Sequence, residues 1–267
     1  MSYSSALHDV LENIIAPAGE LACREGKFPR EAVAALGRAG LLGLTCSAQP
    51  ESGGTDLARA AEVVAQVMPV CPATAAVLQS HYAAAAVVEA YGGRWLRGEV
   101  AAGRHLCTLA VVEDGAAGAV RSTARRAGGV VALRARKRDV VAAGEADSYV
   151  WSSPSVGVDG GLTLWGVPGH APGLFVPARA TGAPLASATS TVVADPVRVP
   201  AEAMLGADGE GFEMLLGAVL PWLLELCGVV GSDAVHPSLG ALARSPSGAA
   251  RTGDGQAFAA SAAMALR

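Results

Sequence analysis

The sequence predicts an α+β fold with a helical domain, then a β-domain, then a shorter helical part. Apolar residues recur every three or four positions through the first hundred residues, which is the spacing of helices that bury one face. From Leu106 to Val199 the pattern changes to short runs of Val, Leu and Thr between clusters of Gly, Pro and Asp, which is typical of strands and turns. One long apolar segment with helical spacing follows Pro200. The domain boundaries are expected at 1–103, 104–200 and 201–267.

Periodicity and capping residues delimit the helices of the first domain. The apolar stripe of the first helix consists of Leu7, Val10, Leu11, Ile14, Ile15, Ala18 and Leu21. Pro29 fits the first turn of the next helix, which Gly40 ends, and Asp56 is a candidate N-cap for the third. The fourth helix is almost entirely apolar, so we expect it to be buried on all sides. The last four helices are expected over 30–38, 56–68, 74–91 and 94–102.

The middle domain is predicted to be an antiparallel barrel or sandwich of short strands. These strands are expected over 106–112, 130–133, 148–151, 162–165, 174–176 and 191–193. A long helix is expected over 210–230, followed by a weakly patterned tail with a last helix over 256–266. Because Pro221 and Glu225 interrupt the apolar run of the long helix, we expect a core helix and no membrane contact.

Composition narrows the classes of function. The 267 residues are 51% hydrophobic and 16% charged, as in a globular protein, and the net charge of −4 argues against a nucleic-acid surface. The five cysteines form no CxxC pair and no signal peptide is visible, so we expect free thiols in the cytoplasm. The five histidines are scattered away from any cysteine, and GxSxG and P-loop motifs are absent. No metal, hydrolase or NTPase site is therefore predicted.

Three longer stretches carry a more specific pattern. They are "FPREAVAALGRAGLLGLTCSAQPESGGTDLARAAEVV" (28–64), "TAAVLQSHYAAAAVVEAYG" (74–92) and "VVADPVRVPAEAMLGADGEGFEMLL" (192–216). In this order they resemble three parts of the acyl-CoA dehydrogenase family. These parts are its N-terminal helical domain, its buried helix beside the acyl chain, and the passage from its β-domain into its C-terminal bundle. The similarity runs unbroken to about residue 231 and implies the fold of that family with a truncated C-terminal part.

In that family FAD lies across the β-domain, where two short motifs hold it. The first motif usually reads Thr-Glu-Pro-Gly-x-Gly-Ser-Asp, and the matching segment here is 112–119. Val112 stands in place of the threonine that faces the flavin, and Gly118 in place of the serine that serves the pyrophosphate. Glu113 is kept, and the resemblance implies that it either takes part in the chemistry or orders its loop.

The second motif usually reads Gly-x-Lys-x-Trp-Ile-Thr and matches 135–141. Lys137 is kept, but Asp139 replaces the tryptophan that packs on the flavin and Val141 replaces the threonine. Each lost hydrogen bond is worth about 1 kcal/mol, and the lost stacking partner about as much again. Asp139 would also oppose the negative charge of a reduced flavin. Together with the changes in the first motif, these losses predict that the chain binds no cofactor; FAD held through unusual contacts is the alternative.

Three hypotheses for the function follow. In the first, which we favour, the chain is a non-redox enzyme or binder for an acyl-thioester or polyketide-like molecule, presented on coenzyme A or on a carrier protein, in secondary metabolism. The chemistry would be cyclisation, isomerisation or elimination. In the second it is an FAD-dependent dehydrogenase, and in the third a non-catalytic partner of a complete homologue. A homodimer is expected, in which a second chain, or segment 256–266, covers Trp222 and Leu223 of the long helix.

Under the first hypothesis the vacated flavin cleft is the pocket. Its walls are expected to include Leu78, Val112, Gly118, Val141, Ala142, Ala143 and Trp222. Asp139 is the candidate general acid or base, because desolvation raises the pKa of a carboxyl group toward neutrality, with His81 as partner if its ring faces the cleft. Alternatively, Asp139 forms a surface ion pair with Arg136 or Arg138, and His81 is a hydrogen-bonded core residue.

A further glutamate completes the candidate catalytic set. Some members of the family carry their catalytic base on the first helix of the C-terminal bundle, and the position that matches it here is Trp222. Glu225 lies one turn further along the same face of that helix, so it is a candidate for a displaced base. The other interpretation is an exposed or helix-pairing glutamate.

Overall fold

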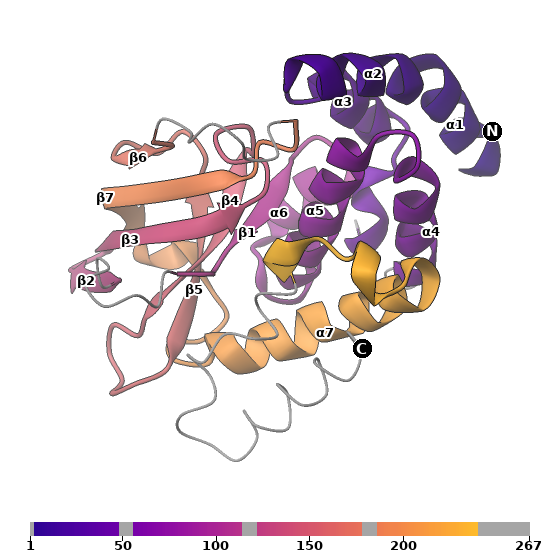
Figure 1. Ribbon diagram of the computed structural model, residues 1–267. Helices are drawn as coiled ribbons and strands as arrows, with labels where there is room; N and C mark the ends of the chain where they lie inside the picture. The colour runs from indigo at the N-terminus through magenta and orange to yellow at the C-terminus, as the bar shows by residue number, and fades with distance from the viewer. Residues whose placement is uncertain (1–2, 48–55, 114–121, 178–185, 240–267) are drawn as a thin grey trace.

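The computed structural model describes residues 3–47, 56–113, 122–177 and 186–239 and confirms the α+β fold (Figure 1). The helices that precede the sheets are α1 (Tyr3–Val10), α2 (Ala16–Glu25), α3 (Arg30–Arg38), α4 (Leu57–Val67), α5 (Pro72–Tyr91) and α6 (Arg94–Ala101). The long helix α7 (Gly211–Val230) follows the last strands. A π-helical segment, Leu11–Ile15, joins α1 to α2, so the predicted first helix is interrupted by one wider turn.

The described strands form two four-stranded sheets. The first sheet has the order β1-β4-β5-β8, with β1 (Cys107–Ala110), β4 (Ser148–Pro154), β5 (Leu162–Pro168) and β8 (Met204–Leu205). The second has the order β2-β3-β7-β6, with β2 (Thr123–Ala127), β3 (Val130–Val140), β7 (Ser190–Pro200) and β6 (Leu174–Phe175). The expectation of purely antiparallel pairing is wrong for β1 and β4, which are parallel. The hairpin of β2 and β3 lies between them in the other sheet, so the chain returns to β4 in its original direction.

The β1-β4-β5-β8 sheet is a middle layer between the helices and the second sheet. Helices α5 and α7 contact its strands, and β1 and β4 also contact strands of the second sheet (Figure 1). Residues 148–153 of β4 are accordingly all buried, as expected for a strand covered on both faces. Strand β3 instead alternates between buried and exposed residues, so the second sheet has one outer face.

The charged run that begins at Arg134 is part of strand β3. The sequence predicted a strand only over 130–133, but β3 pairs with β7 from Val130 as far as Val140. The side-chain alternation of a strand directs Arg134 and Arg136 outward and Lys137 inward. The run forms a strand because its side chains alternate between the core and the solvent. A pattern of charge alone does not reveal this alternation.

Helix α7 packs one face against α4 and α5, as predicted for a core helix. Trp222 and Leu223 lie on this inner face and are buried within the chain itself, so they need no second chain to cover them. The alternative cover, segment 256–266, lies outside the described residues. The Trp222 ring meets Tyr82 edge-on, and its Nε1 donates to the carbonyl of Gln79 at 3.2 Å. By length and composition α7 could also cross a membrane, with 33% of its most apolar window buried. Its outer face, which includes Leu224, is the part that the described residues leave exposed.

Candidate functional site

The predicted cleft residues lie where α5, β1 and the end of β3 meet, and their side chains are packed together. Leu78, Val112, Val141 and Ala142 are all buried. Thr108 Oγ1 donates to the carbonyl of Val141 at 3.0 Å and lies 2.7 Å from Ser80 Oγ, which ties β1 to β3 and α5. The described side chains at these positions therefore form core rather than the walls of an open cleft. Gly118 lies outside the described residues.

A buried ion pair lies beside this junction. Lys137 Nζ contacts the carboxylate of Glu113 and donates to Ser152 Oγ at 2.7 Å, with the ring of Trp151 5.4 Å away. Burial lowers the pKa of Lys137 to about 8, although the Glu113 carboxylate opposes that shift. Glu113 also forms a β-bridge with Lys137, so the pair fixes the segment that follows β1 onto β3. This geometry fits the interpretation of Glu113 as a residue that orders its loop.

Asp139 lies at the far end of β3 in the left-handed backbone region, with φ 55°. Such a conformation is uncommon for a residue other than glycine, although Asp and Asn adopt it more readily than most. Its carboxylate forms an ion pair with Arg138, as one of the alternatives predicted. It also lies near enough to His236 to raise the pKa of that imidazole. Asp139 is partly exposed, and the histidine within its electrostatic range is His236 and not the predicted His81.

His236 belongs to the segment after α7, which hydrogen bonds hold on α5. Its backbone N–H donates to Gln79 Oε1 at 2.7 Å, and Gln79 Nε2 donates to the carbonyl of Ala234 at 3.2 Å. Its Nδ1 is 2.8 Å from Ser238 Oγ and accepts the Ser238 N–H at 3.3 Å, which leaves the ring proton on Nε2. Burial lowers the pKa of His236, against the effect of Asp139, so the ring is neutral near pH 7.

We refer to Asp139, His236 and Ser238 as the acid–base cluster. It unites a carboxylate from the β-domain with an imidazole and a hydroxyl from the segment after α7. The sequence pointed to Asp139 but not to His236 or Ser238. No spacing in the sequence joins them, because only the fold brings Asp139 within electrostatic range of His236.

His81 is deeply buried within α5, and both of its ring nitrogens face backbone groups. Nε2 lies 3.0 Å from the carbonyl of Leu42, and Nδ1 accepts the N–H of Cys107 at 3.2 Å. Burial lowers the pKa of His81 to about 4, so the imidazole stays neutral. This is the geometry of the core-histidine alternative, and His81 has no ring nitrogen left to exchange a proton with Asp139.

The two remaining candidates on α7 differ in their surroundings. Trp222 fills the core between α5 and α7, so it contributes packing rather than an accessible wall. Glu225 is half-buried, and no hydrogen bond or ion pair to it is recorded within the described residues. It takes no part in the acid–base cluster.

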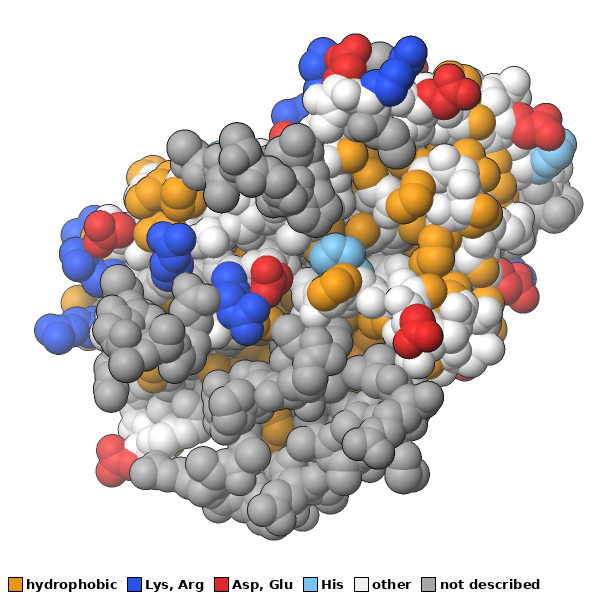
Figure 2. Space-filling view, viewed as in Figure 1, with side chains coloured by type: hydrophobic (Ala, Val, Ile, Leu, Met, Phe, Trp, Pro, Cys, Tyr) orange, Lys and Arg blue, Asp and Glu red, His pale blue; other side chains and the backbone are white. Residues whose placement is uncertain are grey.

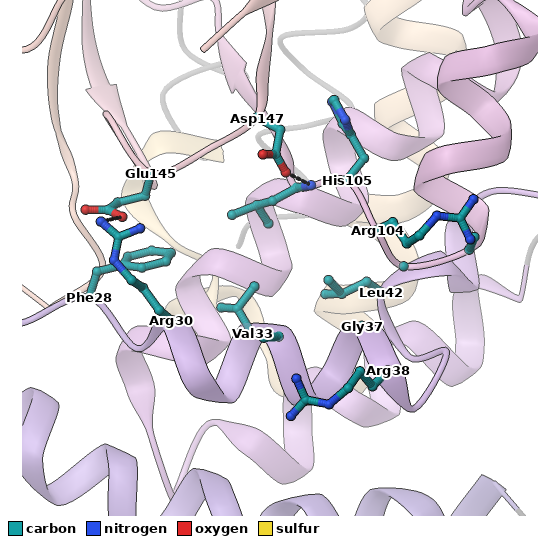
Figure 3. Close-up of a pocket in the computed structure, with 14 residues that line it drawn as sticks. Phe28, Arg30, Val33, Gly37, Arg38, Leu42, Arg104, His105, Glu145 and Asp147 are labelled. Carbon is teal, nitrogen blue, oxygen red and sulfur yellow. Dashed lines mark hydrogen bonds and ion pairs between the residues drawn. The ribbon is translucent and has the colours of Figure 1, made fainter. Parts of the chain in front are cut away.

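A cavity of about 460 Å³ lies elsewhere, between α3 and the start of β1 (Figure 3). Arg30 pairs with Glu145 across it at 2.5 Å, and Asp147 accepts the N–H of Leu106 at 2.7 Å. The imidazole of His105 faces Ser148 Oγ at 2.8 Å, and burial lowers its pKa. None of the predicted site residues lines this cavity, and these polar groups already bind one another, so we place the candidate site at the acid–base cluster instead.

The described residues of the two flavin-motif segments do not fit a flavin. Val112 and Val141 supply no hydroxyl, and their side chains are buried among other apolar groups. The carboxylate of Asp139 is held by Arg138 where an aromatic ring would be needed. No step of a mechanism can therefore be derived through FAD from these residues.

The fold is that of acyl-CoA dehydrogenases. It superposes on a probable acyl-CoA dehydrogenase from Mycobacterium abscessus with a TM-score of 0.73 at 23% identity, covering 99% of this chain and 74% of that one. It also superposes on FkbI, described as serving biosynthesis of the methoxymalonyl extender unit of the polyketide Fk520. That match has a TM-score of 0.68 at 24% identity and covers 99% of this chain and 76% of that one.

The sequence comparisons agree with the fold. Residues 3–101 match the acyl-CoA dehydrogenase N-terminal domain. An acyl-CoA dehydrogenase from Bacillus subtilis (strain 168) is 25% identical over 221 residues, which cover 79% of this chain and 58% of that protein. Residues 3–101 thus belong to the acyl-CoA dehydrogenase N-terminal domain family, and the chain as a whole has the fold of the N-terminal and middle domains of these enzymes. It matches less than two thirds of the length of the Bacillus protein.

Proposed function

We propose that this chain is a non-redox member of its family that moves a proton on an acyl-thioester or polyketide-like substrate. The observation that carries the proposal is the side chain at the position that would stack on a flavin. This side chain is the partly exposed carboxylate of Asp139, at the end of β3 and within electrostatic range of His236. A positioned carboxylate and imidazole are the groups that general acid–base catalysis uses. The likeness to FkbI favours a polyketide-related substrate.

The hydrogen bonds suggest a division of roles within the cluster. The Ser238 N–H occupies Nδ1 of His236, so the neutral ring has Nε2–H to donate. Such a donor would polarise the carbonyl of a thioester, while the Asp139 carboxylate accepts a proton from the carbon next to it. In an isomerisation the proton would then return to another carbon of the same substrate. In an elimination the group on the next carbon would leave with its electron pair and take up the proton, and neither reaction needs an electron acceptor.

A non-catalytic partner subunit is the second candidate, favoured by the outer face of α7. Leu224 is 50% exposed on that face, and Val229, near the end of the helix, is 44% exposed. A homodimer or a pairing with a complete homologue would cover them, because exposed apolar surface of this kind commonly marks an association site.

The absorbance spectrum of the purified protein tests the loss of FAD. We expect no visible flavin band, and no quenching of FAD fluorescence when the cofactor is titrated in. A stoichiometric flavin band, with bleaching when an acyl-CoA is added, would instead establish the FAD-dependent alternative.

Proton transfer is tested with butyryl-CoA in deuterated buffer, with mass spectrometry of the recovered thioester. We expect deuterium next to the carbonyl, and at least a tenfold lower rate in Asp139→Asn and in His236→Gln. Asp159→Asn, which removes an exposed carboxylate elsewhere, is the matched control and should keep the full rate. If Asp139→Asn keeps the full rate and folds normally, Asp139 is only a surface ion-pair residue.

A further inference from the structure

The outer face of the β2-β3-β7-β6 sheet is rich in arginine. Cross-strand pairing aligns Arg125 of β2 with Ala132 of β3, and Ala132 with Arg198 of β7, so both arginines project from the same face. Arg134 and Arg136 follow on β3 with the same outward direction. On the side shown in Figure 2, Lys and Arg side chains gather over the end of the molecule that holds β2, β3 and β7. We call this surface the arginine face.

One acidic residue of the described strands lies on the same face. Asp195 is the acidic residue among the outward-facing positions of the described strands, and it lies 3.2 Å from Arg134 with both side chains 57% exposed. An exposed pair of this kind is worth at most about 1 kcal/mol, so a partner can compete for it. The chain as a whole has a net charge of −4, so this face differs in sign from the rest of the molecule.

Apolar side chains lie within the same face. Phe175 of β6 pairs with Val193 of β7, which in turn pairs with Arg136, and Phe175 is 50% exposed. Val130, at the start of β3, is 42% exposed. Arginine and aromatic residues together are the types enriched in protein–protein interfaces, where they supply much of the binding energy. A sheet surface with these anchors is better suited to bind a folded protein than to bind a nucleic-acid groove or a membrane.

Strand β3 joins the arginine face to the acid–base cluster. Arg134 and Asp139 lie on this one strand, five residues apart, which corresponds to roughly 17 Å at about 3.3 Å per residue. A protein bound on the face could therefore reach the cluster with a flexible arm while its own fold stays outside.

We propose that the arginine face docks a small acidic protein domain that carries the acyl thioester on a flexible arm. The nature of the cargo rests on the proposed function, whereas the docking itself rests on the charge and the apolar anchors. Arg125 and Arg198 are the residues to test, because the described part of the structure shows no ion pair for either of them.

The experiment measures binding of a bacterial holo acyl carrier protein to the full chain by calorimetry. We expect the Kd of Arg125→Glu/Arg198→Glu to rise at least tenfold, and the wild-type Kd to rise with salt because exposed charges are screened. Arg38→Glu/Arg94→Glu makes the same charge change on exposed helical residues and should stay within twofold. Circular dichroism verifies that both variants fold.

Three results overturn the proposal: no binding of the carrier protein, equal weakening by both double variants, or stronger binding of phosphatidylserine vesicles or a DNA oligonucleotide through the same arginines. The butyryl-CoA exchange assay separates this failure from failure of the proposed function. Coenzyme A needs no docked protein, so Arg125→Glu/Arg198→Glu should keep the full exchange rate even when carrier binding is lost.

Discussion

The helical domain and the β3 region of the β-domain differ in how far they match the pattern of the acyl-CoA dehydrogenase family. Residues 3–101 match the family domain, whereas the two motif segments of the β-domain lack the hydroxyls and the aromatic ring expected there. In the helical domain, buried polar groups serve the fold: Tyr82 donates to the carbonyl of Leu41 at 2.6 Å, and His81 links two backbone groups. In the two motif segments, the residues differ from those usual at flavin positions in the family. The pattern of the family is thus matched where side chains pack the helical core, and not at these two segments.

Close backbone contacts show how strict the packing constraint is. Gly37 at the end of α3 approaches Gly103 so closely that a Cβ on Gly37 would lie 2.3 Å from the Gly103 carbonyl oxygen. Gly103 also has a left-handed φ of 68°. A side chain at either position would have to displace backbone, so these residues are fixed by the fold whatever the chain binds.

The largest effect should come from His81→Leu in the helical domain. This change leaves the Leu42 carbonyl and the Cys107 N–H buried without a partner, at about 1–3 kcal/mol each. We expect urea unfolding to show a loss of about 2–6 kcal/mol. His8→Leu, at an exposed histidine, is the control and should change the free energy by less than about 0.5 kcal/mol. A loss for His81→Leu no greater than that of the control would show that these hydrogen bonds do not hold the domain.

The pH dependence of stability sharpens the same test. Burial lowers the pKa of His81 to about 4 from an ordinary value of 6.5, so the unfolded chain binds the proton more tightly. The contribution of the neutral ring is complete above pH 6.5 and is lost as the pH falls toward 4. Wild type should therefore lose more stability than His81→Leu over this interval, and parallel curves would contradict the assignment.

A smaller effect on stability is expected in the β-domain, from the ion pair of Glu113 with Lys137. Glu113→Gln leaves Lys137 buried without its counter-charge and should cost about 2–3 kcal/mol, less than a fully buried pair because Glu113 is partly exposed. Lys137→Met removes the buried charge itself and should be nearly neutral, as should the double variant. Chemical denaturation of the three proteins measures this asymmetry, and equal losses in both single variants would refute it.

The free energy of unfolding of the wild type should rise in alkali relative to that of Lys137→Met, because deprotonation removes the cost of a buried charge. Its pKa in the folded chain, about 8, lies below the ordinary value of 10.5, so the unfolded chain holds the proton more tightly between these values. The free energy of unfolding should rise with pH across this window in wild type relative to Lys137→Met. This contribution is lost as the pH falls through 8.

The sequence predicted the helices and most strands because periodicity and caps are local signals. Asp56 caps α4 through the N–H of Arg59, as expected from its position. The length of β3 was not predicted, because its charged run is stabilised by pairing with a distant strand, β7. The parallel pairing of β1 and β4 was missed for the same reason.

The candidate site was predictable only in part. A motif comparison singles out Asp139, because a carboxylate stands where an aromatic residue is usual. The same comparison placed His81 beside it, but the Leu42 carbonyl and the Cys107 N–H hold that ring in the core. His236 comes within electrostatic range of Asp139 while Gln79 binds the segment after α7, and no local sequence pattern indicates this arrangement.

The smallest effect on stability, with the clearest effect on assembly, is expected at Leu224 on the outer face of α7. Its side chain is 50% exposed while Trp222 and Leu223 face the core, so Leu224→Glu should change the free energy of unfolding by less than about 0.5 kcal/mol. A charge placed there would oppose burial against a second chain. If α7 forms the homodimer contact, sedimentation velocity should show a dimer for wild type and a monomer for Leu224→Glu. The control is Val158→Glu, which changes an exposed apolar residue between β4 and β5 and should stay dimeric. A monomeric wild type, or a Leu224→Glu variant that remains dimeric, would show that association does not use this face.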